Sequence, residues 1–165
     1  MYSVVNASLR LSPKHLSEAQ IKCLFRELCL HLADEGRLED TLFEGMTVRV
    51  LGRLIDAASD FLQAENVIRI QRKLAFGSAP AGLAEFWDTI AEHIKSHGSG
   101  SVILGLGGRY DHWTCIGSIS ETRISLVDSD GLHHLHRKNC TVAEERGGRH
   151  HVLWPTQTYL LNAAP

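Results

Sequence analysis

The first half of the chain carries apolar residues at the spacing of amphipathic helices. Residues 2–11 form one such segment, which Pro13 ends. Ser17 and Gln20 have the capping-box spacing, in which the hydroxyl accepts from a backbone N–H and the amide reaches back. Behind them a single apolar stripe keeps the i, i+3, i+4 spacing (Ile21, Leu24, Phe25, Leu28 and Leu32). Gly36 follows this stripe, and the helix is predicted to end there.

Two further helices and one short strand are expected before residue 99. Residues 46–62 and 83–97 keep the helical period, and Gly98 follows the second segment. Residues 67–70 are rich in β-branched side chains and predict a short strand.

From residue 99 the apolar period changes to that of strands. Strands are predicted over residues 101–106, 111–116, 124–131, 132–136 and 151–153, with the last one resuming near Tyr159. Helices first and an antiparallel sheet second is the α+β arrangement. We therefore predict one domain of 165 residues, in which a helical layer (residues 1–98) packs on an antiparallel sheet (residues 99–165).

The two strands around Ser120 predict a hairpin that brings chemistry together. A hairpin symmetric about Ser120 pairs Ile116 with Ile124, Thr114 with Leu126 and His112 with Asp128. Facing residues of antiparallel strands have Cβ atoms about 4.5–5.5 Å apart and point to the same side of the sheet. In that register the Asp128 carboxylate holds the His112 imidazole in one tautomer, which makes it a general base. A structural interpretation competes, because Asp-Ser-Asp-Gly over residues 128–131 is ordinary turn chemistry, with Asp130 as a turn residue.

These residues carry a family resemblance. His112 and Trp113 stand at the head of one strand, and the hairpin ends in Leu-x-Asp-Ser-x-Gly over residues 126–131. This pattern resembles the papain-like cysteine peptidases, and within them the bacterial C39-like branch. The resemblance is most specific over residues 99–131. It implies a helical layer packed on an antiparallel sheet and a triad that runs Cys, His, Asp/Asn along the chain.

The resemblance also implies roles and a ligand. His112 would deprotonate a thiol, Asp128 would orient His112, and the ligand would be a peptide or protein. Four residues are expected at the cleft: Gly107, Gly108, Trp113 and Ser129. The glycines lack the Lys-Ser/Thr of a phosphate loop, and we expect no cofactor.

The chain departs from the family pattern at the nucleophile. The family places a cysteine at the N-terminus of the first helix, where the helix dipole favours the thiolate. Residues 1–7 instead look like the continuation of that helix. Either the chain starts a few residues too late or the protein has lost its nucleophile, and we predict no peptidase turnover for the chain as given. Cys23 and Cys140 are the possible substitutes. Cys29 fits a small core residue, and Cys115 lies on the hairpin face opposite His112.

A histidine cluster offers a different kind of site. His134 and His136 share a face of the predicted strand, and Cys140 or His150 could add further zinc ligands. Residues 137–138 are Arg-Lys, which disfavours a cation, so an exposed, basic, pH-sensitive edge is the preferred interpretation and no metal is predicted.

Composition and charge limit the classes of partner and the cellular location that we expect. A net charge of −2 and a pI near 6.5 give no electrostatic basis for nucleic acid as a partner. The sequence has neither an apolar run of about 20 residues nor a signal-peptide pattern, so no membrane is expected. The four cysteines lack paired spacing, and free thiols predict a cytoplasmic protein.

Three hypotheses follow from the sequence. The first is a papain-like cysteine peptidase seen without its nucleophile segment. The second is a pseudoenzyme that binds a peptide or protein in the same cleft. The third is a small metal-binding regulatory domain that uses the cluster between His133 and His151.

Overall fold

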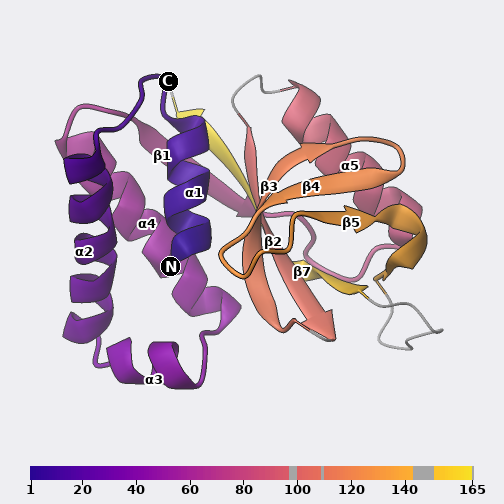
Figure 1. The fold of residues 1–165 in the computed structure, drawn as a ribbon, viewed down its shortest axis with the longest axis horizontal. Coiled ribbons are helices and arrows are strands. Elements are labelled where there is room, and N and C mark those ends of the chain that lie inside the picture. Colours follow the sequence, from indigo (N-terminus) through magenta and orange to yellow (C-terminus); the bar gives the residue numbers. More distant parts are fainter. Residues whose placement is uncertain (97–99, 109, 143–150, 165) are drawn as a thin grey trace.

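A seven-stranded sheet lies between a group of helices on one side and a single helix on the other (Figure 1). The computed structural model describes residues 1–96, 100–108, 110–142 and 151–164. The helices are α1 (Tyr2–Leu11), α2 (Glu18–Asp34), α3 (Leu38–Phe43), α4 (Val48–Ala64) and α5 (Leu83–Ser96). The strands are β1 (Arg69–Leu74), β2 (Ser101–Gly108), β3 (His112–Ile119), β4 (Arg123–Val127), β5 (His134–His136), β6 (Cys140–Thr141) and β7 (His151–Ala164). A 3₁₀ turn, Arg137–Asn139, joins β5 to β6.

The helix ends follow the local signals of the sequence. The predicted capping box is present at α2, since Gln20 N–H donates to Ser17 Oγ at 3.3 Å and Ser17 N–H donates to Gln20 Oε1 at 3.0 Å. Gly36 follows α2 with a φ of +66°, where glycine carries no steric penalty. Thr47 caps α4, and its hydroxyl accepts from Val50 N–H at 3.4 Å. The short α3 was not predicted, because six residues show too little periodicity to be recognised.

The protein is a mixed α+β fold, but its helices cover both faces of the sheet. Helices α1, α2 and α4 bury their apolar stripes in one core, together with Ile103, Cys115 and Tyr159 of the sheet. Helix α5 buries Phe86 and Trp87 in a second core against the other face. In Figure 1, α5 stands on the far side of the sheet from α1, α2 and α4. The predicted single helical layer is therefore divided in two.

The sheet runs β1-β7-β2-β3-β4-β5, and β6 pairs with β7. Its pairs are antiparallel except β6–β7, which is parallel. Strand β1 joins the edge from the helical half of the chain and begins at Arg69, two residues later than predicted. Ser59 of α4 fixes it, because its hydroxyl accepts from Ile70 N–H at 2.9 Å and contacts Ile70 O at 3.1 Å.

Strand β7 is one continuous strand where two segments were expected. Ile103 pairs with Tyr159 and Gly105 pairs with Trp154, so the register shifts between these two pairs. Pro155 lies in the shifted part of β7, where its missing N–H breaks no ladder hydrogen bond. This irregularity explains the interrupted apolar pattern.

The β3–β4 hairpin has a different register from the predicted one. Cys115 pairs with Val127 and Ile116 with Leu126, whereas the prediction paired Ile116 with Ile124. Two local features cause the difference. A bulge lies at Gly117, and the turn closes through Ser120 N–H, which donates to Arg123 O at 2.8 Å. Near His112 the register is displaced by two residues, a whole side-chain period, so the residues keep their predicted face.

Among the described residues, no helix is both long enough and apolar enough to cross a membrane.

Candidate functional site

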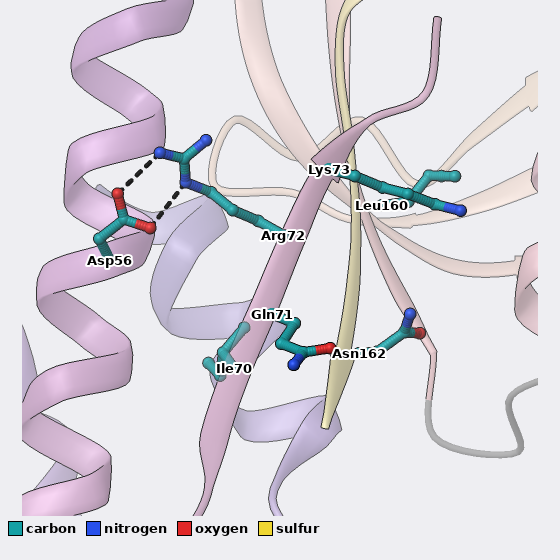
Figure 2. Close-up of a pocket in the computed structure, with 7 residues that line it drawn as sticks. All are labelled: Asp56, Ile70, Gln71, Arg72, Lys73, Leu160 and Asn162. Carbon is teal, nitrogen blue, oxygen red and sulfur yellow. Dashed lines mark hydrogen bonds and ion pairs between the residues drawn. The ribbon is translucent and has the colours of Figure 1, made fainter. Parts of the chain in front are cut away.

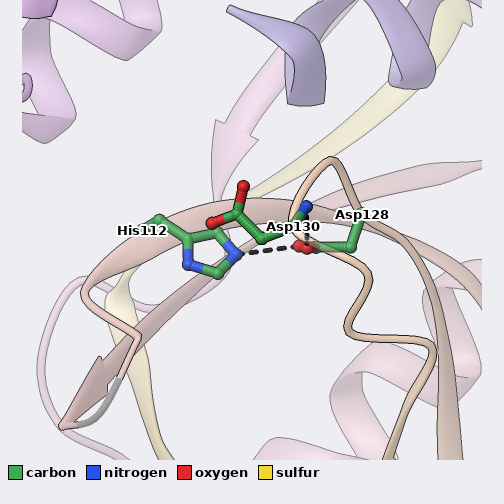
Figure 3. Close-up of side chains that lie close together, drawn as sticks. All are labelled: His112, Asp128 and Asp130. Atoms are coloured by element: carbon green, nitrogen blue, oxygen red, sulfur yellow. Dashed lines mark hydrogen bonds and ion pairs between the residues drawn. The ribbon is translucent and has the colours of Figure 1, made fainter.

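His112 and Asp128 contact each other directly. His112 Nε2 lies 2.8 Å from Asp128 Oδ2, and Figure 3 shows the ring nitrogen directed at that carboxylate. His112 begins β3, and Asp128 follows the last residue of β4. The predicted contact is confirmed, although the two residues are not the facing pair that the symmetric hairpin gives.

The Asp128 carboxylate is buried and fully engaged. Its side chain is 1% exposed, and Oδ1 accepts from the backbone N–H of Asp130 at 2.8 Å. Burial raises the pKa of this carboxyl group, but hydrogen bonds from Thr114, His112 and the Asp130 backbone outweigh burial. The net pKa lies below the ordinary value of 3.8, so Asp128 is a fixed negative charge near neutral pH.

The second ring nitrogen of His112 faces another acceptor. Nδ1 lies 3.4 Å from the Tyr110 carbonyl oxygen, a longer contact than the one to Asp128. A neutral imidazole carries a hydrogen on only one of its two nitrogens, whereas a protonated imidazole can donate to both Asp128 and the Tyr110 carbonyl oxygen. The shorter, charge-assisted contact places the hydrogen of the neutral ring on Nε2. Nδ1 can then take up a proton, which is what a general base needs.

A cavity of about 200 Å³ opens beside His112. The start of α1, the loop before α4, the first turns of α4 and the open end of the hairpin line it: Met1, Tyr2, Ser3, Gly45, Met46, Leu51, Asp111, His112, Trp113, Ser129 and Asp130. The His112 side chain is 20% exposed, so it remains accessible.

Polar contacts hold α1 against the hairpin. Asn6 Nδ2 donates to Val127 O at 3.3 Å, and an Arg10 guanidinium nitrogen donates to Gly117 O at 2.6 Å. Ser3, Asn6 and Arg10 have the i, i+3, i+7 spacing of one helical face. The N-terminal end of that face reaches the cavity at Ser3.

The cleft residues expected from the sequence separate into two groups. Trp113 and Ser129 line the cavity, whereas Gly107 and Gly108 are not among its described lining residues. Gly107 has a packing role instead, since a Cβ there would clash with the Trp154 ring. Gly108 adopts a φ of +78°, the left-handed region that favours glycine.

Sequence reasoning missed the acidic residues of the cavity. Asp130 occupies the predicted turn, but it also lines the cavity, and its carboxylate lies beside the His112 ring in Figure 3. Asp111 precedes His112 and has a φ of +49°. The available signal was their place in the sequence, since Asp111 immediately precedes His112 and Asp130 lies two residues after Asp128.

The four cysteines, all in the described part of the chain, lie outside the lining of this cavity. Cys23 is exposed on α2. Cys29 Sγ lies 3.7 Å from Met1 Sδ, so it comes near the cavity wall without lining it. Cys115 is buried, and burial raises the pKa of its thiol, which disfavours the thiolate. Cys140 is buried and donates to His136 O at 3.3 Å.

The histidine cluster forms an exposed edge. His134 and His136 lie on β5, the edge strand, with ring centroids 5.0 Å apart, and both are exposed. Cys140 is buried, and His150 lies outside the described residues. In the described ranges, metal-ligating atoms gather only at His112, Asp128 and Asp130, within 4.8 Å of one another.

A larger hollow of about 650 Å³ lies over β1 and β7, and Figure 2 shows its lining residues. Arg72 makes two hydrogen bonds of 2.7 Å with the Asp56 carboxylate and lies over the Tyr159 ring. These contacts already use the charged groups of Arg72 and Asp56 within the fold. The cavity at His112 therefore remains the better candidate site.

The arrangement at His112 supports proton transfer to or from a bound group, or its recognition by hydrogen bonds. Comparison with known proteins gives no match, whether with family models, curated proteins or solved structures.

Proposed function

We propose that this chain is a papain-like, C39-like peptidase-fold protein whose cavity binds a peptide segment of its ligand against His112 and Asp128. The observation that carries the proposal is the 2.8 Å contact between His112 Nε2 and the buried Asp128 carboxylate, beside a cavity at the N-terminal end of α1. A buried carboxylate with a lowered pKa that orients an accessible imidazole beside a cavity favours a functional role.

The mode of action that we propose is binding without turnover. Acyl transfer needs a nucleophile within reach of the base. The four thiols, each in the described part of the chain, lie outside the cavity lining. In binding, a peptide N–H would donate to Nδ1 of His112, while Asp128 keeps the ring in place. All four cysteines are free, which supports the cytosol as the proposed location.

A titration with short peptides tests the proposal. Protein carrying ¹⁵N-labelled histidine is titrated with a mixture of unstructured peptides, and the ring nitrogen resonances are followed by NMR. We expect the His112 resonances to shift and the His112→Ala variant to bind more weakly. His15 is exposed and does not line the cavity, so His15→Ala is the matched control and should bind like the unmodified protein.

Mass spectrometry of the same mixtures tests the absence of turnover. We expect the peptides to remain intact. Cleavage that disappears in His112→Ala would show that a nucleophile operates in the cavity. If no peptide binds at all, the proposed function is wrong.

A further inference from the structure

The charge of the cavity beside His112 selects among its possible ligands. Two carboxylates, Asp111 and Asp130, line it, and Asp128 lies beneath. Neither Lys nor Arg is among the described lining residues. His112 is already paired with Asp128, and burial lowers the pKa of the Met1 amino group. The cavity therefore has an excess of negative charge.

The walls of the cavity are apolar and aromatic. Met46 and Leu51 supply aliphatic surface, and Tyr2 and Trp113 supply rings. The Trp113 ring is fixed, because its Nε1–H donates to Gln157 O at 2.9 Å. A cation held near the face of an indole gains a cation–π interaction, and a long aliphatic stem packs on apolar surface while its charged end stays with polar groups.

The volume limits the ligand to one side chain. Pockets for whole small-molecule ligands measure about 300–1,000 Å³. The 200 Å³ cavity is smaller than this range, so it accommodates one long side chain of a larger ligand.

From charge, wall chemistry and size together, we infer that the cavity receives a basic side chain, lysine or arginine, of the peptide ligand. This inference rests on the proposed function and adds a ligand class to it. The ammonium or guanidinium group would lie between Asp130, Asp111 and the Trp113 ring, and the stem would lie along Met46 and Leu51.

A divalent cation is the main competitor for these carboxylates. His112, Asp128 and Asp130 bring ligand atoms within 4.8 Å of one another. A metal on His112 Nε2 would displace the hydrogen that joins this atom to Asp128 at 2.8 Å. A basic side chain can use Asp130 and Asp111 with that contact intact, so the structure favours the basic side chain.

The test compares capped peptides of glycine and serine that differ only in one central residue: lysine, norleucine or glutamate. Norleucine keeps the aliphatic stem and removes the charge. We expect the lysine peptide to bind about tenfold more tightly than the norleucine peptide, with glutamate weakest. One series of titrations contains EDTA, and a second series contains added Zn²⁺ or Mn²⁺ instead.

Conservative variants locate the preference. Asp130→Asn and Asp111→Asn should each reduce the preference for lysine over norleucine several-fold, while the norleucine affinity stays unchanged. Asparagine tolerates the positive φ at position 111. Asp88 is an exposed acid on α5 and gives the matched control, since Asp88→Asn should keep the full preference.

The possible failures are distinguishable. Equal affinity for the lysine and norleucine peptides overturns the basic-side-chain inference but leaves peptide binding intact. A preference that requires the added metal overturns it in favour of a cation site. If none of the three peptides binds, the proposed function fails as well.

Discussion

Thr114 rather than His112 stands across the hairpin from Asp128, where its hydroxyl donates to Val127 O at 3.5 Å and lowers the pKa of the Asp128 carboxyl group. Cys115 pairs with Val127, and Thr114 and Asp128 are the next two facing residues, one step farther from the turn. His112 reaches the carboxylate along the diagonal, a distance that a ring side chain can span. His112 and Thr114, which share one face of β3, therefore both act on the Asp128 carboxyl group.

Replacing Thr114 by valine should destabilise the protein by about 1–2 kcal/mol, because the hydroxyl that donates to Val127 O and favours the charged form of Asp128 is lost while the side-chain shape is nearly kept. Urea unfolding near neutral pH measures the change in the free energy of unfolding. Thr122→Val, at an exposed turn position, is the control and should change it by less than about 0.5 kcal/mol. A Thr114→Val variant as stable as the original protein would contradict the role given to this hydroxyl.

Acid should remove the stabilisation that Asp128 provides. The folded-state pKa of Asp128 lies below 3.8, so the folded state binds its proton less tightly than the unfolded state does. Its contribution is therefore complete at pH values above the unfolded pKa, and it is lost as the pH falls through the folded-state pKa. We expect Asp128→Asn to reduce the loss of stability with acid in this window. Unfolding curves at a series of pH values measure the effect, and identical pH profiles would argue against it.

Gly52 of α4 should not tolerate alanine. A Cβ at this position would lie 2.6 Å from the Tyr159 hydroxyl and 3.1 Å from Arg72 Cζ. The Tyr159 hydroxyl cannot move freely, because it donates to Val48 O at 3.0 Å. Although alanine favours a helix, we expect Gly52→Ala to cost about 1–3 kcal/mol through overpacking.

Thermal unfolding of this variant is compared with that of Gly77→Ala, where a Cβ would meet no atom within 4 Å. We expect a lower melting temperature for Gly52→Ala alone. Equal melting temperatures would mean that α4 and β1 adjust more easily than this packing implies.

A thiol placed at the start of α1 should be activated by His112. Ser3 lies in the first turn of α1 and lines the same cavity as His112. A cysteine there gains both the helix N-terminus and a neighbouring base, which favour the thiolate. We expect Ser3→Cys to react with iodoacetamide about tenfold faster than the exposed Cys23 near pH 6, as measured by peptide mass spectrometry.

The double variant Ser3→Cys/His112→Ala separates the two contributions. Loss of most of the acceleration in the double variant would place His112 within reach of position 3. Equal rates in the single and double variants would rule out that proximity.

Local signals along the chain predicted most of the elements. The Ser17 capping box and Gly36 fixed the limits of α2, and the apolar periods located α1, α4 and α5 to within about two residues. These features depend on neighbouring residues and on the backbone preferences of single side chains, so the amino-acid order is enough to predict them.

The contact between His112 and Asp128 was predicted for a reason that proved only partly correct. Alternation along a strand has a period of two, so an error of two residues in the register kept both side chains on the same face. The bulge at Gly117 and the asymmetric turn at Ser120 were missed, because a bulge leaves little mark on a short apolar pattern.

The amino-acid order therefore determined the helices, the hairpin and the pairing of an imidazole with a carboxylate, since each reflects interactions over short stretches of chain. Packing determined the rest. Helix α5 covers the face opposite α1, and β1 crosses from the helical half to join β7. The start of α1 meets Asp111 and Asp130 in one cavity although more than 100 residues separate them along the chain. Such encounters arise from burial of apolar surface shared by distant elements, which no local pattern encodes.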